Sequence, residues 1–155
     1  MTDSISRREL LARGAAVTLG AMAFPLFRTA DAPKVPMVVY KDPGCGCCEK
    51  WVEIMKTSGF AISVENTTGM AAIKRRYGVS DDLASCHTAL VGGYIVEGHV
   101  PADLIQKLLK EKPKVKGLAV PGMVVGSPGM EGNPKQAYDV VTFDAAGRTT
   151  VYAKR

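Results

Sequence analysis

The chain has 155 residues and a formal net charge of +5, from 20 basic residues against 15 acidic ones. The basic excess is spread thinly, and its densest stretch, residues 107–116, sets lysines among leucine, valine and proline without an aromatic side chain. This composition favours a solvated helix face and excludes an obvious nucleic-acid partner. The sequence shows no internal repeat and no low-complexity tract, so its length fits a single domain.

The first 32 residues have the pattern of an export signal. The pair Arg7-Arg8 precedes an apolar, small-residue run at 14–27, and Ala30-Asp31-Ala32 provides a small-x-small cleavage pattern. The apolar run is shorter than the ~18–20 residues that a membrane-spanning helix needs. We therefore expect residues 1–32 to be a twin-arginine-type export signal and the protein to be periplasmic.

The remaining residues, 33–155, are expected to form one domain with no membrane segment after the signal is removed. Pro33 directly follows the predicted cleavage point and is unfavourable for signal peptidase. Cleavage at another position, or retention of the segment as an anchor, is therefore the alternative.

Hydrophobic periodicity in this domain predicts alternating strands and helices. Strands are predicted at 36–41, 60–65, 88–91, 94–96, 138–143 and 149–152, and helices at 47–58, 68–77 and 101–110. No strand is predicted in the Gly- and Pro-rich stretch 117–134. The order of strand, cysteine loop, helix, strand and helix is typical of the thioredoxin-like α/β class. We expect a mixed central sheet that ends in a C-terminal β-hairpin.

Cysteines carry the clearest chemical signal in the sequence. Three of the four, Cys45, Cys47 and Cys48, lie within four residues, and the fourth, Cys86, directly precedes His87. Thiolate sulfur and imidazole nitrogen suit Cu(I), Zn(II) or an iron–sulfur centre. A disulfide framework fits poorly, because a bridge within the trio closes only a few residues and stabilises the fold little. The pattern therefore favours metal or redox chemistry.

The cysteine loop is predicted to meet the start of a helix. Cys45 precedes that helix and Cys48 lies in its first turn, so both sulfurs can face the same side. Unpaired N–H groups at a helix N-terminus stabilise thiolates. A dithiol enzyme needs only these two sulfurs, so the additional Cys47 indicates a ligand cluster. A thioredoxin-like fold also places a cis-proline beside its cysteine loop, and Pro121 is the candidate for it.

Other soft ligands are weaker candidates. Cys86 and His87 stand at the start of a predicted strand, where successive side chains point to opposite faces, so both can reach one centre only if the backbone is irregular there. His99 is expected to be a structural residue at a helix entry unless the fold brings it near Cys86. Met123 and Met130 are possible thioether ligands in a loop, but packing is the favoured role for each.

Five motifs occur together in the domain: CxCC at 45–48, Cys-His at 86–87, GY-x-VEGHVP at 93–101, PGM at 121–123 and GSPGME at 126–131. In these motifs the chain resembles the family of CopG-type periplasmic copper-resistance proteins over nearly all of residues 33–155. The resemblance implies a thioredoxin-like fold and a thiolate-bridged multinuclear copper centre, with ligands Cys45, Cys47, Cys48, Cys86 and His87. It also implies a role in copper tolerance, through redox conversion or transfer of copper to copper-export or other periplasmic copper-handling proteins.

Two alternatives remain open. Four thiolates can close one tetrahedral zinc site, although adjacent Cys47 and Cys48 suit the bridging of several ions better than the chelation of one. A periplasmic thiol–disulfide oxidoreductase would use Cys45 and Cys48 and would need no other cysteine. An oxidising compartment can also join these two residues in a disulfide, which would couple metal release to oxidation.

Overall fold

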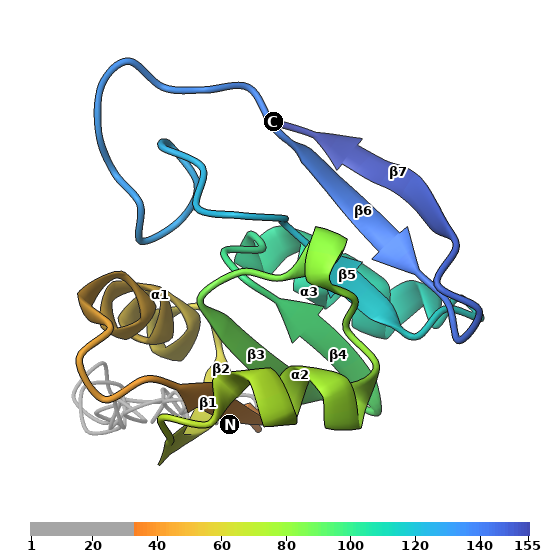
Figure 1. The fold of residues 1–155 in the computed structure, drawn as a ribbon, viewed down its shortest axis with the longest axis horizontal. Coiled ribbons are helices and arrows are strands. Elements are labelled where there is room, and N and C mark those ends of the chain that lie inside the picture. Colours follow the sequence, from red (N-terminus) through yellow and green to blue (C-terminus); the bar gives the residue numbers. More distant parts are fainter. Residues whose placement is uncertain (1–32) are drawn as a thin grey trace, which may run out of the picture. The chain divides into compact units, whose positions relative to one another are not determined.

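The computed structural model describes residues 33–155, and the predicted export signal at 1–32 lies outside the described residues. A seven-stranded mixed sheet runs in the order β2-β1-β3-β4-β5-β6-β7 (Figure 1). The pairs β1–β2 and β4–β5 are parallel, and the other neighbours are antiparallel. The strands are β1 Val35–Lys41, β2 Phe60–Asn66, β3 His87–Val91, β4 Tyr94–Glu97, β5 Gly117–Ala119, β6 Asp139–Phe143 and β7 Thr149–Lys154. The helices are α1 Gly46–Thr57, α2 Met70–Tyr77 and α3 Ala102–Glu111, with a short 3₁₀ turn η1 at Asp81–Leu83.

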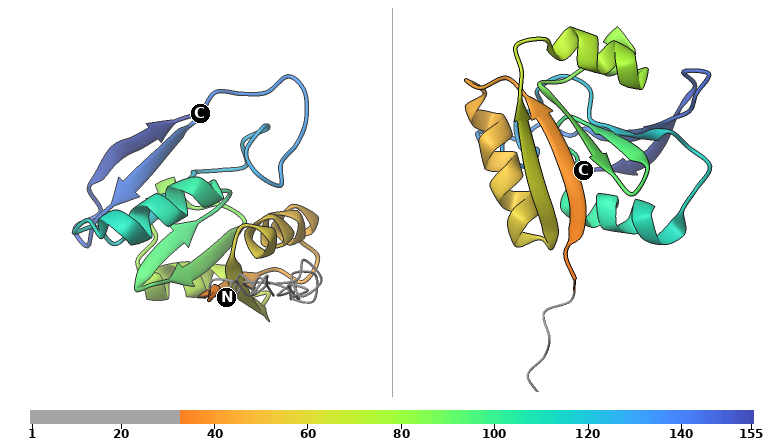
Figure 2. Two further views of the ribbon diagram at one scale, coloured as in Figure 1. Left: turned by 180° about the vertical axis from the view of Figure 1, so that it is seen from behind. Right: turned by 90° about the horizontal axis from the view of Figure 1, so that it is seen from below.

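Two hydrophobic clusters cover the opposite faces of the sheet. In Figures 1 and 2, α3 and α2 lie on opposite sides of β3 and β4. The larger cluster joins α1 and α3 to one face, with members Trp51, Val52, Met55, Leu104, Ile105 and Leu108 against Met37, Val39, Ala89 and Val96. The smaller cluster lies on the other face, with members Val79, Leu83, Ile95, Ala119 and Phe143. Because strand side chains alternate, neighbouring residues of β3 therefore enter two different environments.

The predicted secondary structure is present in the protein. The α/β class, the mixed sheet and the C-terminal hairpin of β6 and β7 are confirmed. Boundaries differ by at most two residues, the largest shifts being that α2 begins at Met70 and not at residue 68, and that β7 ends at Lys154 and not at residue 152. The thioredoxin-like assignment stays a prediction. None of the helices within residues 33–155 has the length and apolar character needed to cross a bilayer.

Two details differ from the expectations. Strand β5 was not predicted, because three residues are too few to show alternation and the surrounding stretch is rich in Gly and Pro. A Cβ at Gly117 would lie 1.8 Å from the Ile95 carbonyl oxygen, so only glycine allows β5 to approach β4 there. The expectation for Pro121 is wrong, because the cis peptide bond within residues 33–155 is the one between Asn133 and Pro134.

Candidate metal centre

The cysteine loop lies between β1 and the first turn of α1. The Asp42 carbonyl accepts a hydrogen bond from the Cys45 N–H (3.1 Å), and the Asp42 carboxylate accepts one from the Gly44 N–H (2.8 Å). This tight turn places Cys45 at the N-cap of α1 and Cys48 inside its first turn, as predicted. Cys45 and Cys48 are joined by a disulfide, and Cys48 is fully buried.

The other two cysteines lie beside this disulfide. The Cys47 sulfur is 3.5 Å from that of Cys45 and 3.8 Å from that of Cys86, which lies 39 residues further along the chain. All four sulfurs lie within 4.8 Å of one another. Cys86 stands in a bend directly before β3, so the alternation of strand side chains does not separate it from His87.

Both histidines of the chain approach Cys86. Its sulfur is 3.3 Å from His87 Nδ1 and 2.9 Å from His99 Nε2. His99 Nδ1 lies 2.8 Å from the Pro128 carbonyl oxygen, which can only accept, so Nδ1 carries the proton and donates. The lone pair of His99 is therefore on Nε2 and faces the Cys86 sulfur. The fold thus brings His99 next to Cys86, which is the condition under which we expected His99 to be a ligand candidate.

His87 is fully buried beside Trp51, and one of its two ring nitrogens makes no hydrogen bond to the described residues. Its ring centroid lies 4.4 Å from that of Trp51 and 4.9 Å from that of His99. Within residues 33–155, His87 Nε2 is the buried side-chain nitrogen that has no hydrogen-bond partner. Burial lowers the pKa of His87 well below its usual value, so the ring is neutral, which is the form that binds metals. Nδ1 of His87 faces the Cys86 sulfur, and a buried Nε2 that no described residue satisfies is consistent with a ring that serves as a metal ligand.

Burial also changes the acid–base properties of Cys86 and His99. Burial, with a further contribution from the neighbouring Cys47 thiol, raises the pKa of Cys86 to about 12. Burial lowers the pKa of His99, while its hydrogen bond to the Pro128 carbonyl acts in the opposite direction. The Cys86 thiol is therefore protonated at neutral pH, and a cation that binds this sulfur must displace the proton.

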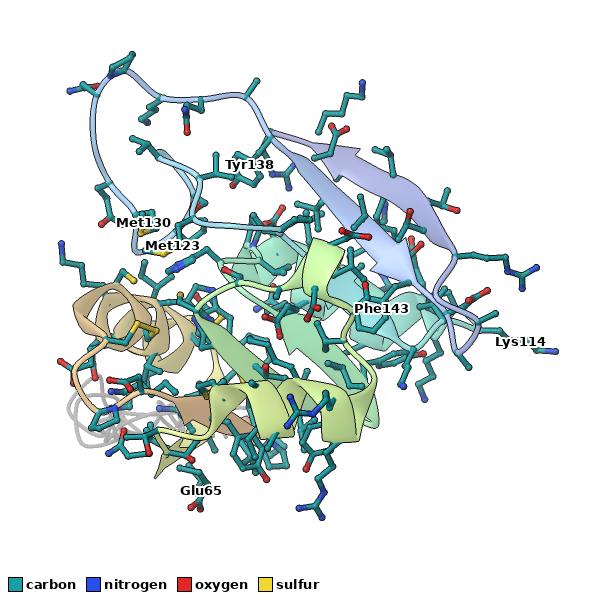
Figure 3. The ribbon with its side chains drawn as sticks, in the orientation of Figure 1. Glu65, Lys114, Met123, Met130, Tyr138 and Phe143 are labelled. Carbon is teal, nitrogen blue, oxygen red and sulfur yellow. A yellow bond between two sulfur atoms is a disulfide. The ribbon has the colours of Figure 1, made fainter. Side chains whose placement is uncertain are left out.

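The segment between β5 and β6 closes over the cysteine loop. Gly129, with φ of +83°, packs so closely on α1 that a Cβ there would lie 2.9 Å from the Cys47 carbonyl oxygen and 2.9 Å from the Trp51 nitrogen. Figure 3 labels Met123 and Met130 on this segment. Met123 is 55 % exposed, so the expected packing role does not apply to it, whereas Met130 is partly buried.

The structure therefore brings together every residue of the predicted ligand set, Cys45, Cys47, Cys48, Cys86 and His87, and adds His99. Five of these six side chains were predicted as ligands from the sequence, and His99 was expected to be structural. His99 lies 13 residues after Cys86 in the sequence, and the hairpin of β3 and β4 brings it beside the other candidate ligands.

The chain is similar to one described protein family and to two solved structures. Residues 83–130 match the family described as "Protein of unknown function, DUF411". The solved structure of "Copper resistance protein copG", Form 2, is 42% identical with a TM-score of 0.75, and covers 79% of this chain and 98% of that chain. Form 1 of the same protein is 41% identical with a TM-score of 0.74 over the same shares of both chains. No curated protein gives a significant match.

Proposed function

Because the chain belongs to the family of CopG copper-resistance proteins, we propose that it is a periplasmic protein whose reduced cysteines hold a multinuclear Cu(I)–thiolate centre. Family membership and the cysteine cluster support a copper-binding role in copper resistance. The multinuclear centre rests on one observation, the four sulfurs that lie within 4.8 Å of one another. Sulfurs at such spacing can bridge neighbouring soft ions, which Cu(I) favours.

Cys45, Cys47, Cys48, Cys86 and His87 are the proposed ligands, and His99 completes the set. The donors are soft sulfur and imidazole nitrogen, which fit copper in its lower oxidation state. The unpaired Nε2 of buried His87 supports its inclusion, and the orientation of His99 Nε2 toward the Cys86 sulfur supports that of His99. A single zinc ion would be satisfied by four thiolates and would leave both histidines without a role.

The oxidation state of the cysteines controls how many ligands are available. Copper binds to thiolates, and the Cys45–Cys48 disulfide ties up two of the four sulfurs. Reduction by a dithiol takes up two electrons and two protons, and it yields two thiols here and one disulfide on the reductant. We therefore expect the reduced protein to hold its full copper load and the disulfide form to hold much less.

Anaerobic titration with Cu(I) against a competing chelator tests this function. The reduced protein should bind several copper ions at saturation, and the protein with its Cys45–Cys48 disulfide intact should bind fewer. Bound copper should also protect the thiols from timed alkylation, as measured by mass spectrometry. Saturation at a single ion, or equal labelling of the loaded and metal-free forms, would contradict a thiolate-bridged centre.

A thiol–disulfide oxidoreductase is the second candidate, because a disulfide stands at the N-terminus of a helix and its Cys45 is only half-buried. In that function a partner dithiol is oxidised to a disulfide while Cys45–Cys48 is reduced to two thiols. The Cys47→Ser variant separates the two candidates, since it keeps this dithiol pair and loses one bridging sulfur. Full copper capacity in this variant would leave the oxidoreductase as the better explanation.

The proposed periplasmic location depends on residues outside the described part of the chain. If residues 1–32 direct twin-arginine export, replacing Arg7 and Arg8 with lysine should retain the protein in the cytoplasm, as measured by cell fractionation. Unchanged export would contradict that route. Copper-export and other periplasmic copper-handling proteins are the proposed partners for the bound copper.

A further inference from the structure

A buried carboxylate lies directly behind the Cys86-His87 pair. Glu97, the last residue of β4, has no exposed surface and is the register partner of Thr88 on β3. Its Oε1 accepts hydrogen bonds from the Ser85 backbone N–H (2.7 Å) and from the Lys74 ammonium group, and its Oε2 accepts one from the Thr88 hydroxyl (2.6 Å). The two carboxylate oxygens of Glu97 therefore bind α2, the loop before β3, and β3 itself.

These hydrogen bonds stand on both sides of the two candidate ligands. Ser85 directly precedes Cys86, and Thr88 directly follows His87. Between them, the His87 carbonyl accepts a hydrogen bond from the Gly98 N–H at 2.9 Å. The segment that carries the two ligands is thus attached to residues 97 and 98 at its beginning, middle and end.

Close packing restricts this segment further. Gly98 has φ of +70°, and a Cβ there would lie 2.5 Å from the Ser85 Cβ and 2.7 Å from the Val120 carbonyl oxygen. The Ser85 hydroxyl in turn donates to the Gly122 carbonyl of the segment that closes over the site. The next residue after Gly98 is His99, whose Nε2 meets the Cys86 sulfur. Residues 97–99 therefore contact the Cys86 sulfur through His99 and bind the flanking residues Ser85 and Thr88 through Glu97.

Stability alone does not account for a buried charge pair at this position. Lys74 is 12% exposed and Glu97 is 0% exposed in their side chains. Replacing such a buried pair with well-packed apolar residues is often neutral or stabilising, because burial removes both charges from water. The directional bonds from Glu97 to Ser85 and Thr88 are what an apolar replacement would lose. Groups that orient metal ligands by hydrogen bonds typically change metal affinity about 10–100-fold when mutated, and Glu97 would act in this way through the two residues that flank the candidate ligands.

We propose that Glu97 is a positioning residue for the copper site, which holds Cys86 and His87 in place by hydrogen bonds to Ser85 and Thr88. Lys74 compensates its charge on the same side of the sheet. The effect on copper binding rests on the proposed function, whereas the effect on the metal-free thiol does not.

Two substitutions of Glu97 separate geometry from charge. Glu97→Gln keeps an oxygen for the Ser85 N–H, and its amide nitrogen can donate to the Thr88 hydroxyl. Glu97→Ala removes all three hydrogen bonds. If Glu97 acts by positioning, Glu97→Gln should retain most of the wild-type behaviour, and Glu97→Ala should weaken Cu(I) binding about 10–100-fold.

A matched control distinguishes positioning from general destabilisation. Phe143→Leu removes buried volume from the cluster on the same face of the sheet as Glu97, without touching Ser85 or Thr88. All variants are compared at a temperature where urea titration shows each to be fully folded. Besides copper affinity, the readout is the alkylation rate of Cys86 relative to Cys47 in the reduced, metal-free protein. In Glu97→Ala this ratio should rise, because Cys86 is no longer held against His99, and in Phe143→Leu it should not change.

Wild-type copper affinity together with an unchanged alkylation ratio in Glu97→Ala would overturn the positioning role. Equal changes in Phe143→Leu and Glu97→Ala would also overturn it, because the effect would then follow stability alone. If the wild-type protein itself fails to bind several copper ions, the proposed function is contradicted, and the alkylation ratio still decides the role of Glu97.

Discussion

The two sides of strand β3 differ in whether their buried polar groups have hydrogen-bond partners. On one side, which we call the carboxylate side, Glu97, Lys74 and Thr88 satisfy one another by hydrogen bonds. On the other, the cysteine–histidine side, no described residue gives the buried His87 Nε2 a hydrogen bond, and the Cys86 sulfur lies beside Cys47, His87 and His99. The hydrogen bonds of the carboxylate side are made within the chain, whereas the cysteine–histidine side keeps donor atoms that the proposed copper site would use.

This difference has an energetic meaning. A buried polar group without a hydrogen bond costs about 1–3 kcal/mol, so the cysteine–histidine side is a local cost to folding. Packing of α1 offsets it, because Trp51 is fully buried against His87 and donates from its indole nitrogen to the Val100 carbonyl at 3.0 Å. Apolar packing of Trp51 on the cysteine–histidine side and hydrogen bonds of Glu97 on the carboxylate side therefore both hold the Cys86-His87 segment in place.

The largest expected effect tests the packing on the cysteine–histidine side. Trp51→Ala should lower the free energy of unfolding by about 3–5 kcal/mol, since it leaves a cavity beside His87. Trp51→Phe fills most of that volume and loses only the hydrogen bond to Val100, so it should cost less. Urea denaturation of the metal-free protein measures both. Equal losses would show that the hydrogen bond, and not the packing, supports this side.

Next in size is the loss of the sulfur that joins the cysteine loop to the histidines. Cys86→Ser should weaken Cu(I) binding more than about 100-fold, beyond the range for residues that only orient ligands, because a hydroxyl is a hard substitute for a thiolate. Serine at Cys45, Cys47 or Cys48 should likewise lower the copper capacity. Thr88→Val on the carboxylate side is the control and should have a smaller effect. Chelator competition measures all five variants, and an unchanged Cys86→Ser variant would remove Cys86 from the site.

The histidines should contribute less than any cysteine. His87→Ala and His99→Ala are each expected to weaken Cu(I) binding less than Cys86→Ser does, because four soft thiolates remain and most of the copper capacity with them. His87→Ala should also relieve the cost of the unpaired nitrogen, so its loss of stability should be smaller than its buried volume implies. Chelator competition and urea denaturation measure the two effects separately. If His99→Ala leaves the affinity unchanged, its contact with Cys86 is structural only.

The smallest effect concerns the segment that closes over the cysteines. Gly122 and Gly129 both have positive φ, at +72° and +83°, but only a Cβ at Gly129 would meet other atoms within 4 Å. Gly122→Ala should therefore cost about 1–2 kcal/mol from the backbone conformation alone. Gly129→Ala should cost more and should also weaken copper binding, since it lifts the segment from Cys47. Identical losses in stability and affinity would show that the close approach to α1 does not matter.

Local features of this chain were open to prediction from the sequence because they depend on neighbours along it. Two short runs at residues 88–91 and 94–96, joined by the tight turn Gly92-Gly93, predicted β3 and β4. The Asp42-Pro43-Gly44 turn before an apolar helical pattern placed Cys45 at the N-terminus of α1. The donor types and the crowding of three cysteines already indicated soft-metal or redox chemistry. Each of these follows from backbone periodicity, turn geometry or the chemistry of single side chains.

Contacts between distant segments were decided by the tertiary structure. His99 is a weak ligand candidate in the sequence, and only the β3–β4 hairpin and the Pro128 carbonyl orient its ring toward Cys86. Glu97 is an ordinary strand-end residue in the sequence, and its three hydrogen bonds exist only because α2 and residue 85 pack behind β4. Strand β5 likewise depends on the close approach of Gly117 to β4. Such contacts join residues that local periodicity does not relate, so they arise only when the sheet assembles and both of its faces are covered.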